Sequence, residues 1–124
     1  MRTAILAFLI LAATVTPVQA SPAVEQVIVE RAEAHGVSPW ALRQTLGCET
    51  GWTWNRWAVG ASGELGIAQL HPYGLLPTFF AYGYSDPYSV WQAVDFTAVM
   101  FAQGMATHWS CYWTRVLGSV PPWW

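Results

Sequence analysis

The stretch CETGWTWNRWAVGASGELGIAQLHP, residues 48–72, carries most of what the sequence says about fold and function. Its glutamate, Glu49, ends an apolar helical pattern. The tryptophans that follow have neither helical nor strand spacing, which predicts a loop. A glycine-rich turn over 60–63 leads into 65–70, and we expect one or two helical turns there, closed by Pro72.

Two helices are predicted before this stretch. Ser21-Pro22 and Ser38-Pro39 each place a serine N-cap before a proline, the residue favoured at the first helical position. Apolar residues then recur at helical spacing, and Gly36 and Gly51 mark the two ends. These signals predict helices over about 22–35 and 39–49.

Glu49 falls in the last turn of the second predicted helix, on the same face as Leu42 and Leu46. Partial burial and the negative end of the helix dipole both raise the pKa of a carboxyl group. A glutamate that stays protonated near neutral pH meets the requirement for a general acid. The alternative is an ordinary surface glutamate at a helix end, and position alone does not choose between them.

A long, largely buried helix is predicted near the other end of the chain. Ser89 with Gln92 three residues later is a capping-box start, and the apolar pattern runs to about Gln103. We expect Asp95 on the solvent side of this helix, with an orienting role in the site as the alternative. A short helix is predicted over 75–80. The fold class is therefore all-α, a small helical domain.

The composition limits the function classes. A chain of 124 residues with a net charge of -2 and no lysine has no basic patch for nucleic acid or an anionic membrane. Its nine tryptophans are the unusual feature. Most are expected to be core or surface filler, although an indole face also suits stacking on a sugar ring.

Residues 1–20 have the layout of a secretory signal peptide. Arg2 precedes an apolar run over 4–13, and Val18-Gln19-Ala20 offers small residues for cleavage. The run is shorter than the roughly 18 residues that a membrane span requires. We therefore expect export to the periplasm, the cell envelope or the medium, with one mature domain over 21–124.

Cys48 and Cys111 form an even cysteine count in a chain that we expect to be exported, which favours a disulfide. Two unpaired buried thiols are the alternative. No histidine stands at ligand spacing beside either cysteine, so we expect no metal site.

The segments Glu49-Thr50-Gly51-Trp52 and 60–72 together resemble the soluble lytic transglycosylase domain, which shares the lysozyme-like fold with goose-type lysozymes. The shared pattern is a helix-end Glu followed by Ser or Thr and Gly, then Gly-Ala-x-Gly-x-x-Gly-x-x-Gln about ten residues on. The resemblance covers Ser38 to roughly Tyr112. The chain departs from it late, where Cys-Tyr-Trp stands in place of the family's Ala-Tyr-Asn.

The resemblance implies a sugar-binding cleft and a role for each matching residue. Glu49 would be the single catalytic acid, and Gly66, Ile67 and Gln69 would border the cleft in the Gly-x-x-Gln motif. Tyr112 would take the place of the family's tyrosine beside the acid. Gly66 also lowers helix stability, which indicates a close backbone approach. The implied partner is the glycan strand of peptidoglycan, with no cofactor, no nucleic acid and no named protein partner.

The implied activity is cleavage between N-acetylmuramic acid and N-acetylglucosamine, leaving a 1,6-anhydro end. Two alternatives stay open. A hydrolytic lysozyme generally needs a second carboxylate, and only Glu64, Asp86 and Asp95 are near enough in sequence. A non-catalytic cell-wall-binding module would use the tryptophans to hold glycan, and Glu49 would be incidental.

Overall fold

The computed structural model describes residues 20–124, so the expected signal peptide, apart from Ala20, lies outside the described residues. The described part is mainly helical and has no β-strand, only two isolated β-bridges, which confirms the all-α prediction. No helix within it is long and apolar enough to cross a membrane. Its elements are α1 (Pro22–His35), α2 (Pro39–Glu49), α3 (Leu75–Ala81), α4 (Val90–Ala102), the 3₁₀ turn η1 (Ala106–His108), α5 (Ser110–Tyr112) and the π-helical η2 (Trp113–Leu117).

The first two helices begin and end as the sequence predicts. The hydroxyl of Ser21 accepts a hydrogen bond from the N–H of Val24 at 3.4 Å, and Ser38 caps α2 in the same way. Gly36 ends α1 in the left-handed conformation with φ 69°. Because α2 ends at Glu49, this carboxyl group lies at the last helical position.

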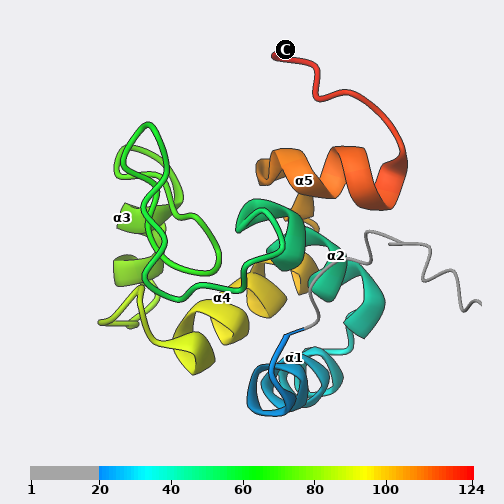
Figure 1. Ribbon diagram of the computed structural model, residues 1–124, viewed down its shortest axis with the longest axis vertical. Coiled ribbons are helices and arrows are strands. Elements are labelled where there is room, and N and C mark those ends of the chain that lie inside the picture. The colour runs from blue at the N-terminus through cyan, green and yellow to red at the C-terminus, as the bar shows by residue number, and fades with distance from the viewer. Residues whose placement is uncertain (1–19) are drawn as a thin grey trace, which may run out of the picture.

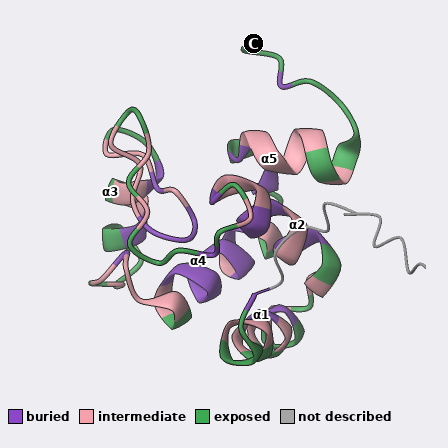
Figure 2. Cartoon of the chain, viewed as in Figure 1, coloured by how far each residue is buried: buried purple, intermediate pink, exposed green. Residues whose placement is uncertain are grey.

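Helix α4 lies at the centre of the fold, where it packs against α1 (Figure 1). Most of its residues from Ala93 to Met100 are buried, as the colouring in Figure 2 shows. An aromatic cluster extends the core: the Phe96 ring meets the Phe79 ring edge to face with centroids 5.3 Å apart, and Trp109 lies beyond it. Helix α2 packs against α1, and it also packs against α5 and η2.

The expectation of a solvent-facing Asp95 is wrong. Its residue is only 7% exposed, and its carboxylate accepts hydrogen bonds from Tyr84 Oη at 2.6 Å and Arg31 Nη1 at 3.3 Å, with His35 Nε2 at 2.7 Å. Burial by itself raises the pKa of Asp95, but these hydrogen bonds and positive charges outweigh it and lower that pKa below its ordinary value. Asp95 therefore joins α1, α4 and the loop before α4.

The expected helical turns over 65–70 are also absent. This segment forms a tight turn in which Leu65 and Leu70 pair as an antiparallel bridge, with N–H to C=O distances of 3.1 and 3.0 Å. Gly66 has φ 75° and Gln69 has φ 49°, and neither value is helical. The N–H of Gln69 donates to the carbonyl of Gly66 at 3.1 Å, and the N–H of Gly66 donates to the carbonyl of Ala58 at 2.9 Å, a pattern that differs from the i to i−4 bonds of a helix.

The predicted capping box of α4 is half formed. Ser89 accepts from the N–H of Gln92 at 3.2 Å, as expected. The Gln92 side chain, however, accepts from the N–H groups of Ser85 and Asp86 at 2.8 and 3.0 Å. It therefore fastens the preceding loop to α4 and does not return to the N-cap.

Candidate functional site

A cleft of about 510 Å³ lies beside the end of α2. The end of α2 borders it together with the glycine-rich turn, the start of α3 and the segment around α5. The residues lining it are Glu49, Gly60, Ala61, Glu64, Gln69, His71, Gly74, Leu75, His108, Trp109, Ser110 and Trp123.

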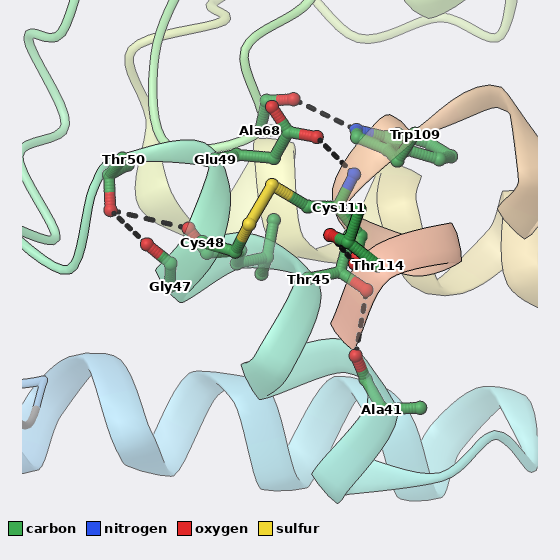
Figure 3. Close-up of a disulfide and its surroundings, with 11 residues drawn as sticks. Ala41, Thr45, Gly47, Cys48, Glu49, Thr50, Ala68, Trp109, Cys111 and Thr114 are labelled. Carbon is green, nitrogen blue, oxygen red and sulfur yellow. Dashed lines mark hydrogen bonds between the residues drawn. A yellow bond between two sulfur atoms is a disulfide. The ribbon is translucent and has the colours of Figure 1, made fainter. Parts of the chain in front are cut away.

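Glu49 reaches this cleft from the last position of α2. Its Oε1 accepts a long hydrogen bond, 3.4 Å, from the backbone N–H of Cys111. Figure 3 shows this contact beside the Cys48–Cys111 disulfide, which joins α2 to α5. The predicted disulfide is therefore confirmed, and it fixes the chain on both sides of the carboxyl group.

The pKa of Glu49 is raised to about 7. Burial is the main cause, because removal from water disfavours the charged form. The Cys111 hydrogen bond lowers the pKa and the negative charge of Glu64 raises it again. Near neutral pH this group is populated in both protonation states, so it can donate a proton and can accept one.

Gln69 also lines the cleft. Its Nε2 donates to the backbone oxygens of Gly66 at 2.9 Å and Ala58 at 3.3 Å, which fixes the orientation of the amide. A Cβ at Gly60 would lie 2.6 Å from Oε1 of Gln69 and would collide with the carboxylate of Glu64. Gly60 therefore leaves the room that both side chains occupy.

The other three predicted substrate-binding residues are not among the described residues that line the cleft. Gly66 is buried against the carbonyl of Pro87, with which a Cβ at this position would collide. Ile67 is a core residue, 1% exposed. The Tyr112 ring packs edge to face on Phe101 with centroids 5.3 Å apart. Glu49 and Gln69 are thus the predicted residues that the fold brings together in the cleft.

Trp109 connects the turn that carries Gln69 to the start of α5. It is 2% exposed, and its Nε1 donates to the backbone oxygen of Ala68 at 2.9 Å (Figure 3). The bond joins residues 41 positions apart, so the turn that carries Gln69 is held at a fixed distance from the start of α5. Breaking it would leave a buried carbonyl without its partner.

Little in the sequence pointed to several of the cleft residues. Glu64 lies within the glycine-rich motif, but no feature of the motif distinguished it from Asp86 and Asp95 as a possible second carboxylate. His71, His108, Ser110 and Trp123 come from separate segments, and only the fold places them together. Within residues 20–124, no group of histidine, cysteine, aspartate and glutamate is arranged to hold a metal ion.

Comparisons of the chain with family models, with curated proteins and with solved structures find no match.

Proposed function

We propose that this protein is a peptidoglycan lytic transglycosylase with a lysozyme-like domain, and that Glu49 is its single acid and base. The observation that carries the proposal is the Glu49 carboxyl group, half-buried in a cleft wall with a pKa of about 7. The resemblance of 38–112 to the transglycosylase domain supplies the substrate. The disulfide supports a location outside the cytoplasm, in the periplasm, the envelope or the medium.

The reaction follows from one carboxyl group that changes protonation state. Protonated Glu49 donates its proton to the glycosidic oxygen while the bond from that oxygen to C1 of N-acetylmuramic acid breaks. The resulting carboxylate accepts the proton of the C6 hydroxyl, whose oxygen attacks C1 and closes the 1,6-anhydro ring. No water is consumed, and Glu49 ends the cycle protonated. A pKa near the working pH suits both steps.

The test is digestion of purified peptidoglycan with the exported chain and with Glu49→Gln. We expect the Gln variant to lose at least about a hundredfold in rate, since general acid catalysis contributes that much or more. Glu33→Gln is the matched control, because Glu33 is exposed on α1. Mass spectra of the native digest should show anhydro ends, lighter by one water than reducing ends. Native-rate digestion by Glu49→Gln would overturn the assignment, and glycan binding without cleavage by the parent would favour a binding module.

Hydrolysis is the second candidate, and one observation favours it. Glu64 lines the same cleft as Glu49 and its charge raises the Glu49 pKa, so a second carboxylate is present. In a hydrolase Glu64 would activate water or stabilise the cationic centre. Glu64→Gln separates the two: we expect it to keep anhydro products at a rate within about tenfold of the parent. Reducing ends from the parent, lost in Glu64→Gln, would establish the hydrolase.

A further inference from the structure

Five of the nine tryptophans are exposed, and one of these five lines the cleft. Trp40, Trp57, Trp91 and Trp124 lie elsewhere on the surface, whereas Trp123 is 57% exposed and borders the space that Glu49 faces. Exposing an indole to water is unfavourable when a partner surface is absent. An exposed indole that borders a concave site is therefore a candidate contact for a ligand.

The segment 118–124 holds Trp123 in place. Gly118, with φ 64°, ends η2 in the left-handed conformation, and the chain then turns back above α5 (Figure 1). Pro121 is fully buried and anchors the segment, and the N–H of Trp124 donates to its carbonyl at 3.2 Å. The buried Pro121 and the turn that it forms with Trp124 therefore hold the segment that carries Trp123.

The indole of Trp123 is also oriented. Its ring packs on Trp113 edge to face, with centroids 6.2 Å apart and an interplanar angle of 88°. Trp113 is itself fixed, because its Nε1 donates to the backbone oxygen of Thr107 at 2.9 Å. An edge-to-face contact with Trp113 covers at most one face of the Trp123 ring, so Trp113 leaves the other face uncovered. An oriented indole loses little conformational freedom when a ligand binds, which favours affinity.

We propose that Trp123 is a sugar-stacking platform of the cleft, on whose face a pyranose ring of the glycan packs next to the residue cleaved at Glu49. The inference rests on the proposed function, because it takes a glycan as the ligand. The axial C–H groups of a pyranose form an apolar face of the size of an indole, and the sugar hydroxyls remain free for polar groups of the cleft. Trp123 stacks on a sugar that neighbours the cleaved one and exchanges no proton with the breaking bond. It therefore contributes to binding affinity and not to the chemical step.

The experiment measures glycan binding in a Glu49→Gln background, which prevents turnover during the titration. The probes are a chitin pentasaccharide and uncrosslinked peptidoglycan strands, and the readouts are calorimetry and tryptophan fluorescence. We expect Trp123→Ala to weaken binding about tenfold or more, the effect of about 1.4 kcal/mol. Trp123→Phe keeps an aromatic face and should recover most of the affinity. In the Glu49 parent, Trp123→Ala should raise KM more than it lowers kcat.

Trp124→Ala is the matched control, because Trp124 is the adjacent tryptophan, is 73% exposed and does not line the cleft. It should bind glycan like its parent. Trp123→Ala also loses the ring contact with Trp113, so binding is compared at a temperature where circular dichroism shows both tryptophan variants fully folded. Equal binding by Trp123→Ala and Trp124→Ala would overturn the stacking role and leave the proposed function standing. No glycan binding and no cleavage by the parent would overturn both.

Discussion

The backbone nitrogen of Cys111 lies 3.4 Å from Oε1 of Glu49, and the disulfide partner of Cys111 is Cys48, the residue directly before Glu49. The covalent link between α2 and α5 therefore also sets the distance between the carboxyl group and the Cys111 N–H that hydrogen-bonds to it (Figure 3). Since that N–H lowers the Glu49 pKa and burial between the same elements raises it, the disulfide affects both the stability and the acidity of the site.

Removing the disulfide should destabilise the domain strongly. The bridge spans 63 positions, for which the chain-entropy model gives about 4 kcal/mol. We expect Cys48→Ser with Cys111→Ser to lower the free energy of unfolding by about that amount, measured by urea denaturation. Cleavage measured where the variant is still folded should also fall, because Glu49 loses its fixed position. Unchanged stability on reduction of the native protein would contradict this prediction.

Cleavage should decline as pH rises above about 7, the pKa of Glu49. The general acid must start protonated, so kcat/KM should fall about tenfold per pH unit on the alkaline side. The negative charge of Glu64 raises the Glu49 pKa, and Glu64→Gln should therefore move this fall to lower pH. A profile that stays flat from pH 6 to 9, or a shift to higher pH in Glu64→Gln, would argue against Glu49 as the acid.

The raised pKa of Glu49 also makes stability depend on pH. The folded state holds the proton more tightly than the unfolded chain, whose glutamate has the ordinary pKa of 4.5. This stabilisation is fully present below about pH 4.5 and is lost as pH rises through about 7. Relative to the parent, Glu49→Gln should gain up to about 3 kcal/mol between pH 4 and pH 8.

Urea denaturation at the two pH values measures this difference, with the disulfide kept intact. Glu33→Gln, which also removes one carboxyl group but at an exposed position of α1, is the control. The same stability difference between Glu49→Gln and the parent at both pH values would mean that the carboxyl group titrates as it does in water.

Asp95→Asn should destabilise the fold by about 3 kcal/mol at pH 7, because it leaves Arg31 and His35 without their buried carboxylate. Since the Asp95 pKa is lowered in the fold, its stabilisation is present above the ordinary pKa of 3.8 and is lost as pH falls below it. Asp95→Asn should therefore show a shallower acid unfolding than the parent, measured by circular dichroism.

The half-exposed ion pair between Arg43 and Glu25, with atoms 2.7 Å apart, provides the control. Glu25→Gln should cost less than about 1 kcal/mol, because water competes for an exposed pair. Equal losses from Glu25→Gln and Asp95→Asn would show that the buried network adds nothing beyond a surface pair.

Gly66→Ala should destabilise the protein by more than the strain of its φ of 75° alone, because the added methyl group would meet the carbonyl oxygen of Pro87. Gly83→Ala is the matched control: its φ is 92° and no other atom lies within 4 Å of the added Cβ. We expect about 1 kcal/mol for the control and at least about 2 kcal/mol more for Gly66→Ala, from thermal unfolding. Equal effects would remove the role of the Pro87 contact.

The sequence by itself determined the features that depend on neighbouring residues. Ser21 and Ser38 fixed two helix starts, Gly36 fixed one helix end, and the helical pattern placed Glu49 in the last turn of α2. These signals are local because a cap or a helical face involves residues within about one turn. The disulfide between Cys48 and Cys111 was predictable for a different reason, since the chain offers a single possible pair.

The tertiary structure decided everything that depends on distant contacts. The turn over 65–70 is fastened by the bond from Trp109 to Ala68, 41 positions away, and by the close approach of Gly66 to the carbonyl of Pro87, which no local pattern encodes. Asp95 is buried because cations and a phenol from other segments meet it there. Trp123 reaches the cleft only because its segment folds back after Gly118, and this proximity, like the burial that raises the Glu49 pKa, arises from chain segments far apart in sequence.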